Sequence, residues 1–282
     1  VGGWYVAYDF EPHGMTFAKP LLFVQDLAKT NATSGMALGG AYFADPTHLD
    51  TATGTAAVSE LFTLSAELDR QHEYTVAWVD CLAKGAAAGR GVFMAGNHAT
   101  NGELLLTEKG KLKIPFTPPV SAINPLTLQA FNSVYFHAHK AGRHFTRVNY
   151  DPFFYPLDRI LEWNRIYGPR GFQQYQCVIP QKHAQDGVGA MLKAIATEGM
   201  GSFLAVLKRC GNIPSPGLLS FPQEGVSLAL DFPQHNTANS RLFDRLDSIL
   251  RETGGRLYPA KDAHMSSDDF RRAYPAWERI EA

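Results

Sequence analysis

Hydrophobic positions follow clear periods from Thr55 onward. Apolar residues at three- and four-residue spacing between Val58 and Leu68 predict a helix, and the alternating residues 74–80 that follow predict a strand. Residues 97–124 are polar and contain three prolines, which favours an excursion over the surface. The first 54 residues, punctuated by glycines, give neither a repeat nor a motif.

The second half of the chain is more regular and predicts two successive βαβ units. Between the predicted strands, one helix carries Val188, Met191, Leu192 and Ile195 and stops at Gly199, and a second helix carries Leu242, Leu246, Ile249 and Leu250. The predicted strands are 173–179, 203–209, 226–232 and 256–258. This order predicts an α+β fold of the ferredoxin-like type, an antiparallel sheet with helices on one face and the other face free.

Composition narrows the classes of protein that fit. With 282 residues, 45% of them hydrophobic, the chain can bury a substantial core in one large or two modest domains. The formal net charge of −1 provides no global field that would attract nucleic acid or anionic lipid, so we expect no nucleic-acid partner.

The cysteines and histidines do not predict a disulfide framework or a metal site. The three cysteines are too far apart in the sequence for either a disulfide framework or a zinc site. The pair His137 and His139 has no carboxylate at ligand spacing, so we expect no metal.

Apolar runs are too short for a membrane span. None approaches the roughly 20 residues that cross a bilayer, and the first residues do not have the layout of a signal peptide. The sequence therefore predicts a cytoplasmic protein or one peripheral to the inner membrane.

Polar residues on the free face of the predicted sheet are the first candidates for chemistry. Period-two alternation places Gln174 and Gln176 on one face of their strand, and Ser227, Ala229 and Asp231 on one face of another. If the polar faces line up, Gln174, Gln176, Lys208 and Ser227 would surround a cavity suited to a polyol or a phosphate. A solvated outer face fits the same pattern, so both interpretations stay open.

Two longer motifs favour the pocket over the solvated face, through their resemblance to a known family. Residues 153–180 read FFYPLDRILEWNRIYGPRGFQQYQCVIP, and residues 254–262 read GGRLYPAKD. Both runs resemble the flavin-dependent sugar oxidases of the vanillyl-alcohol-oxidase superfamily, above all the family of decaprenylphosphoryl-β-D-ribose oxidases, which act in cell-wall arabinan synthesis. The resemblance extends over roughly residues 55–280 and is strongest in these two runs.

The resemblance implies FAD as cofactor and assigns roles to individual residues. Lys261 and Tyr258, matched through the second run, would lie at the flavin, where a lysine can stabilise negative charge. A surface lysine beside Asp262 is the plainer alternative for Lys261. The family positions that line the substrate pocket match Gln174, Gln176, Lys208, Ser227 and Ala229, and the matched segments also include Trp78 and Tyr155, which fit plain core equally well.

Some positions depart from the family pattern. Ser227 stands where the best-known members have asparagine, and Ala229 stands where they have cysteine or serine. Hydrogen bonds to a sugar would differ, so the sugar specificity of the family is not carried over.

The glycine-rich turns that hold the FAD pyrophosphate in this superfamily are missing from residues 1–54. We therefore expect either a piece of a longer enzyme or a flavin-binding domain on another chain. On this basis residues 1–54 are unassigned, residues 55–255 form the substrate-binding domain, and residues 256–282 return toward the flavin domain.

Several functions remain open at this point. One is the substrate-binding portion of an FAD-dependent oxidoreductase that oxidises a secondary alcohol of a sugar or sugar-phospholipid. An enzyme like the aldonolactone or alditol oxidases is the nearest competitor. A non-catalytic binding or scaffold domain without flavin is the third, and it is favoured by the missing phosphate-binding turns.

Overall fold

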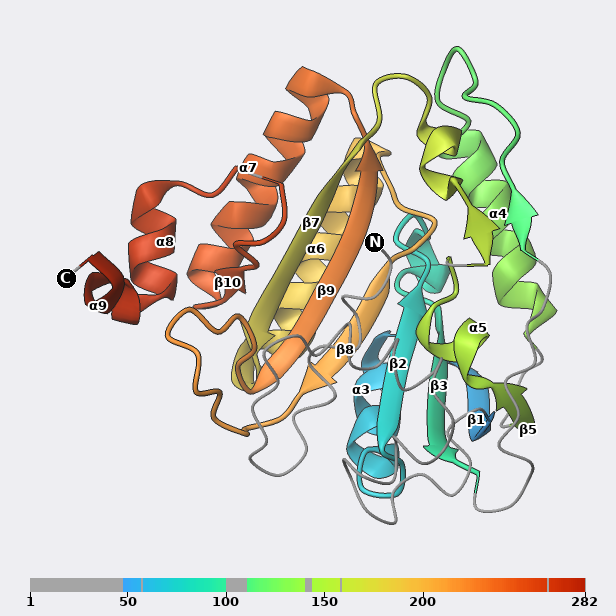
Figure 1. Cartoon of the computed structure of the whole chain (residues 1–282), viewed down its shortest axis with the longest axis horizontal. Coiled ribbons are helices and arrows are strands. Elements are labelled where there is room, and N and C mark those ends of the chain that lie inside the picture. The colour runs from blue at the N-terminus through green and yellow to red at the C-terminus, as the bar shows by residue number, and fades with distance from the viewer. Residues whose placement is uncertain are drawn as a thin grey trace.

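The computed structural model describes residues 48–56, 58–99, 111–139, 144–157, 159–262 and 264–281. Most of the unassigned N-terminal segment, residues 1–47, lies outside these ranges. The fold combines one large sheet with helices that lie against it (Figure 1).

Within these ranges, eight strands form the large sheet in the order β10-β7-β9-β8-β2-β3-β1-β5. Their bounds are β1 His48–Ala56, β2 Tyr74–Val79, β3 Gly91–His98, β5 His144–Asn149, β7 Phe172–Pro180, β8 Val206–Cys210, β9 Gly225–Pro233 and β10 Arg256–Leu257. A two-stranded parallel sheet joins β4 Leu112–Lys113 to β6 Ile160–Leu161. The helices are α3 Val58–Leu68, α4 Pro125–Ala138, α5 Tyr150–Phe154, α6 Ala184–Glu198, α7 Asn236–Glu252, α8 Ser267–Ala273 and α9 Glu278–Glu281.

The α+β class and the ferredoxin-like arrangement predicted from the sequence are confirmed. Strands β7, β8, β9 and β10 alternate with α6 and α7 along the chain, and neighbouring strands among them pair antiparallel. In Figure 1, α6 lies behind β7 and β9, so the opposite face of these strands points toward the viewer. As expected, α6 ends at Gly199 in a left-handed conformation (φ 67°).

One predicted strand boundary is wrong. The strand expected from residue 203 begins at Val206, because the preceding backbone makes other hydrogen bonds. The Phe203 carbonyl accepts from Trp78 Nε1 at 2.9 Å, and the Leu204 N–H donates to Ser202 Oγ at 3.1 Å. Residues 202–204 are therefore held by side chains rather than by a neighbouring strand.

The other half of the sheet was not predicted as such. Strand β2 pairs with β3, β3 with β1, and β1 with β5, all antiparallel, and β2 joins this half to β8 through Ala77 and Trp78. The sheet is thus a ferredoxin-like unit widened by four strands.

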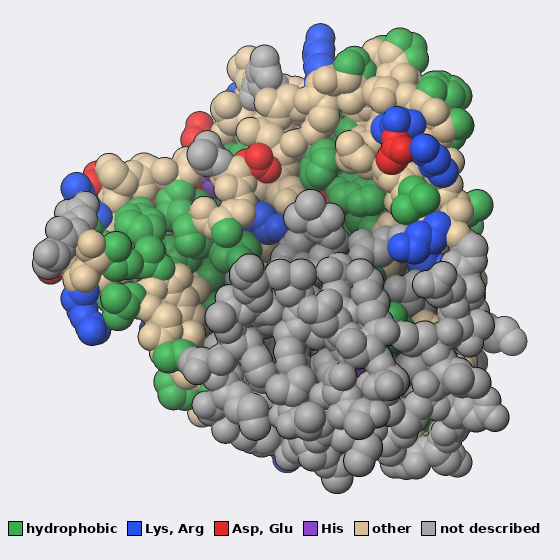
Figure 2. Space-filling model, viewed as in Figure 1, with side chains coloured by type: hydrophobic (Ala, Val, Ile, Leu, Met, Phe, Trp, Pro, Cys, Tyr) green, Lys and Arg blue, Asp and Glu red, His purple; other side chains and the backbone are tan. Residues whose placement is uncertain are grey.

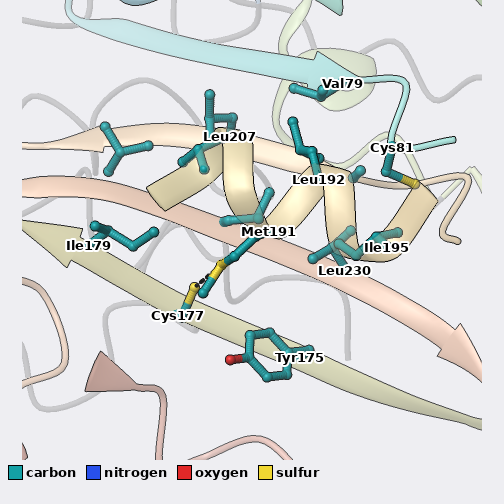
Figure 3. Packing of buried hydrophobic residues seen from close by; sticks show 14 of the residues in the cluster. Val79, Cys81, Tyr175, Cys177, Ile179, Met191, Leu192, Ile195, Leu207 and Leu230 are labelled. Atoms are coloured by element: carbon teal, nitrogen blue, oxygen red, sulfur yellow. Dashed lines mark hydrogen bonds between the residues drawn. The ribbon is translucent and has the colours of Figure 1, made fainter. Parts of the chain in front are cut away.

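The core lies between the sheet and the helices α3, α6 and α7. Buried side chains from β7, β8 and β9 meet those of α6 there, as Figure 3 shows for Ile179, Met191, Ile195, Leu207 and Leu230. These strand residues occupy every second position, so the alternate positions point to the opposite face. The core thereby fixes which side chains are available for a site.

The segment after α7 runs close beside β7 because Gly255 allows it. A Cβ at Gly255 would lie 2.7 Å from the Val178 carbonyl oxygen and 2.4 Å from a methyl carbon of Leu250. Arg256 and Leu257 then pair with Val178 and Cys177, and the Tyr274 hydroxyl donates to the Leu257 carbonyl. This packing holds residues 258–262 at the edge of the sheet.

Other sequence expectations concern cysteines, metals and membrane spans. Cys81 and Cys177 are free and buried, and burial raises the pKa of both thiols. No cluster of potential metal ligands occurs in the part of the chain that the structure describes. Within that same part, no helix is both long and apolar enough to cross a membrane.

Candidate functional site

The register of the strands brings the predicted polar residues onto one face. Cross-strand partners point to the same side of a sheet, and Gln176 lies opposite Ala229 while Lys208 lies opposite Ser227. Gln174 lies opposite Asp231. This face, the polar face of β7, β8 and β9, is the one that α6 and α7 leave uncovered.

Three side chains on this face form a continuous hydrogen-bonded row. Lys261 Nζ donates to Gln174 Oε1 at 3.2 Å, and Gln174 Nε2 donates to Asp231 Oδ1 at 2.9 Å. One contact uses the amide oxygen as acceptor and the other uses the amide nitrogen as donor, so together they fix the orientation of the Gln174 side chain. The Gln174 backbone N–H also donates to Asp262 Oδ2 at 2.6 Å. We call Lys261, Gln174 and Asp231 the polar row.

Burial perturbs both ends of the polar row. The pKa of Lys261 falls from its usual value to about 8, because burial disfavours the ammonium more strongly than Asp231 and Asp262 favour it. Burial raises the pKa of Asp231 to about 6, although the Gln174 hydrogen bond and the charge of Lys261 act in the opposite direction. A lysine and a carboxyl group that both titrate near neutral pH are typical of functional sites.

Unpartnered acceptors lie on the same face. Gln176 Nε2 contacts Ser227 Oγ at 3.4 Å, while Gln176 Oε1 is buried without a hydrogen-bond partner. Asp231 Oδ2 is likewise buried and unpartnered, in a residue that is only 2% exposed. Such groups cost free energy unless a donor satisfies them. The hydroxyl groups of a bound polyol would supply those donors.

Tyr258 lies next to the polar row. Its backbone N–H donates to the Gln176 carbonyl at 2.9 Å, and its ring packs against Phe221 with centroids 4.7 Å apart. Lys261 Nζ is 5.7 Å from the centre of the Tyr258 ring. The structure therefore brings Tyr258 and Lys261 together, as their sequence run predicts.

A cavity of about 260 Å³ lies over β2 and β8. Its walls are mainly aromatic and aliphatic, and Lys208 supplies a cationic group. The lining residues are Tyr74, Thr75, Val76, Ala77, Trp78, Met94, Phe131, Tyr135, Phe153, Phe154, Pro156, Leu157, Ile160, Phe203, Leu204, Val206 and Lys208. Five of them come from residues 153–160, so the start of the first sequence motif forms one wall of the cavity.

The structure separates the predicted residues into two groups. Gln174, Gln176, Ser227, Ala229, Tyr258 and Lys261 belong to the polar face of the ferredoxin-like strands, with Ala229 supplying no polar atom. Trp78 lines the cavity. Lys208 connects the groups, since it pairs with Ser227 and also lines the cavity. Tyr155 is 4% exposed, packs against Tyr150 and Phe154, and is not among the cavity-lining residues.

Asp231 is the site residue that sequence reasoning did not single out. Its strand alternation already placed it on the face of Ser227 and Ala229. The signal that would have found it is its pairing with Gln174, which depends on the register of β7 against β9. Register cannot be obtained from either strand alone.

Comparison with known proteins supports the family resemblance. No family model matches the chain. It is 32% identical over 228 residues to "Decaprenylphosphoryl-beta-D-ribose oxidase" of Mycolicibacterium smegmatis, a match that covers 75% of this chain and 48% of that protein. The chain is a relative of this oxidase. It is also 28% identical over 239 residues to "Uncharacterized protein in mprA 5'region" of Streptomyces coelicolor, covering 79% of this chain and 65% of that protein.

The chain thus spans about half the length of the oxidase and somewhat less than two thirds of the Streptomyces protein. The similarity confirms the resemblance predicted from the sequence, and a relative named as an oxidase makes this chain an oxidoreductase homologue.

Proposed function

We propose that the chain is the substrate-binding portion of an FAD-dependent oxidoreductase that oxidises a secondary alcohol of a sugar-phospholipid, a step of cell-wall biosynthesis. The observation that carries this proposal is that the polar row and the apolar cavity lie on the same side of the sheet and are connected through Lys208, which pairs with Ser227 and lines the cavity. Residues 55–255 would bind the substrate, and residues 256–282 would return toward a flavin domain.

The residues of the polar face fit a flavin and a sugar together. FAD, when bound, accepts the hydride that leaves the alcohol carbon. Lys261 and Tyr258 are the residues that would hold the ring, because an ammonium group stabilises negative charge next to it and a phenol ring packs against it. The unpartnered oxygens Gln176 Oε1 and Asp231 Oδ2 would accept hydrogen bonds from sugar hydroxyls.

The hydride and the proton that leave the alcohol each have a destination. Oxidation of a secondary alcohol to a ketone removes a hydride from carbon and a proton from oxygen; the proton leaves to water. Lys261 Nζ would stabilise the negative charge that develops on this oxygen, and Gln174 keeps the ammonium group in place through its 3.2 Å contact. Ser227 and Gln176 would orient the sugar.

The cavity favours a lipid-linked substrate over a free polyol. An alditol or aldonolactone has no hydrocarbon part to fill a volume lined by Trp78, Tyr135 and Phe154. A prenyl chain does, and Lys208 at the same cavity would contact the phosphate that joins lipid to sugar. The cavity therefore supports the sugar-phospholipid alternative.

A visible absorption spectrum tests the proposal. Protein incubated with FAD and the flavin domain of a relative, and then freed of excess cofactor, should show the bands of oxidised flavin, and these bands should bleach when farnesylphosphoryl-β-D-ribose is added without oxygen. If the protein binds flavin but the flavin absorption bands persist after the substrate is added, the proposed alcohol oxidation is contradicted. A protein that remains colourless, also when the flavin domain of a relative is supplied, would favour the scaffold alternative.

A further inference from the structure

Exposed apolar side chains are concentrated in one part of the molecule. Eight of the eleven large hydrophobic residues that are exposed in the described part of the chain fall between residues 112 and 161. Six of them form what we call the apolar rim: Leu112 (75% exposed), Phe116 (66%), Val120 (73%), Leu126 (77%), Val134 (70%) and Leu161 (43%). Exposed apolar groups gathered in this way mark an interaction surface.

The members of the apolar rim are connected through the structure. Leu112 and Leu161 lie on the paired strands β4 and β6, and the Arg165 side chain donates to the Ile114 and Pro115 carbonyls. The Ala122 N–H donates to the Ile166 carbonyl at 2.8 Å, which brings residues 120–122 beside the same segment. Helix α4 follows directly, begun by the Asn124 cap.

Helix α4 is unusual for a surface helix. Its sequence PLTLQAFNSVYFHA contains no Lys, Arg, Asp or Glu, and Leu126, Ala130 and Val134 form an exposed apolar stripe four residues apart. The inward side is mainly apolar, with Leu128 and Tyr135, and its buried Asn132 donates to Asp80 Oδ1. An uncharged helix that exposes such a stripe offers an apolar surface in addition to the side that faces the protein core.

Charge around the apolar rim is mainly positive. Among the described residues, Lys111, Lys113 and Arg165 lie in or beside the rim segments, and Glu162, next to Leu161, forms ion pairs with Lys113 and Arg165. Between residues 111 and 150 the sequence contains five basic residues and no acidic residue, in a chain whose formal net charge is −1. Hydrophobic side chains interspersed with lysines and arginines, and with an acidic side chain beside them, follow the upper right edge in Figure 2, where Figure 1 places α4 and the segment before it. Apolar residues flanked by cations match the headgroups and acyl chains of an anionic lipid surface.

The apolar rim is also continuous with the cavity. Phe131 of α4 lines the cavity and is 42% exposed, and Ile160 lines it next to the exposed Leu161. A lipid tail that enters from the rim would therefore meet apolar side chains along the whole way to Trp78.

We infer that the apolar rim docks the protein onto an anionic lipid bilayer and admits a lipid-linked substrate from the bilayer into the cavity. The substrate class rests on the proposed function, whereas the docking itself rests on the rim alone. Vesicle binding requires neither flavin nor turnover, so its failure is distinguishable from a failure of the oxidation chemistry.

Vesicle flotation tests this inference. The protein should bind vesicles of equal parts phosphatidylglycerol and phosphatidylcholine, bind vesicles of phosphatidylcholine alone more weakly, and lose affinity as salt is raised. The combined substitution Phe116→Ser, Val120→Ser and Leu126→Ser should weaken binding by at least about tenfold, because the inserted apolar area is lost. Lys111→Glu should weaken it in the same direction.

Matched variants provide the controls. Ile213→Ser combined with Ile280→Ser removes apolar side chains of similar exposure (63% and 56%) outside the rim and should leave binding unchanged. Lys193→Glu, on α6, controls for Lys111→Glu. Circular dichroism and unfolding midpoints verify that each variant is folded. The inference would be overturned if wild-type protein did not bind anionic vesicles. It would also be overturned if the rim variants and the control variants bound them equally.

Discussion

Replacing Lys261 by Met in the flavin-loaded enzyme should lower turnover between about 100- and 1000-fold, because the loss of one preorganised charge at a developing anion has this size in other enzymes. Methionine keeps much of the volume and the apolar stem, so the fold should survive. Steady-state kinetics with farnesylphosphoryl-β-D-ribose measure the effect, and we expect it mainly in kcat.

Lys193→Met provides the matched control. Lys193 lies exposed on α6, on the covered face of the sheet, so its replacement should leave kcat unchanged. If Lys261→Met and Lys193→Met enzymes turn over alike, Lys261 does not act in the reaction and is a half-buried lysine with a structural role.

Replacing Asp231 by Asn should lower kcat/KM between about 10- and 100-fold, the range expected when a charged hydrogen-bond acceptor is removed. Asp231 acts here as a positioning residue. Its carboxylate accepts from Gln174, which holds the amide so that Gln174 Oε1 faces Lys261. Asparagine keeps the shape but removes the charge that favours the Lys261 ammonium.

The pH profile separates this role from a merely structural one. In the wild-type enzyme, kcat/KM should fall as the pH drops through about 6, where Asp231 becomes protonated, and fall again as the pH rises through about 8, where Lys261 loses its proton. In the Asp231→Asn enzyme the acid limb should disappear. The alkaline limb should move to lower pH, because the charge of Asp231 raises the pKa of Lys261. A profile that keeps both limbs in place would contradict the assignment.

Much of the ferredoxin-like half was predictable because the spacing of apolar residues within each of its helices and strands is regular. Val188, Met191 and Ile195 define the inner side of α6 without reference to any other segment, and glycines mark the ends of both helices. The strands β1, β3 and β5 were not predicted, because their residues carry no comparable alternation and their pairing is set by partners distant in sequence.

The site was predictable to a similar degree. Alternation placed Gln174, Gln176 and Ser227 on a common face, and the resemblance added Tyr258 and Lys261. The contact between Gln174 and Asp231 depends on register, and the cavity depends on how α4 and α5 fold over β2. Of the apolar rim, Leu112, Phe116 and Val120 lie in the segment 97–124 that the sequence predicts as a surface excursion. The exposure of the rim as a whole required the tertiary structure.

In the proposed function, flavin and sugar bind directly over Lys261. Acylation of lysine amines, followed residue by residue with mass spectrometry, tests it without relying on activity. The lowered pKa of Lys261 makes its amine reactive near neutral pH. FAD together with farnesylphosphoryl-β-D-ribose should slow the labelling of Lys261 in proportion to the fraction of protein with bound flavin, while Lys193 should be labelled at an unchanged rate. Equal labelling of Lys261 with and without bound flavin would show that flavin and sugar do not bind over this lysine.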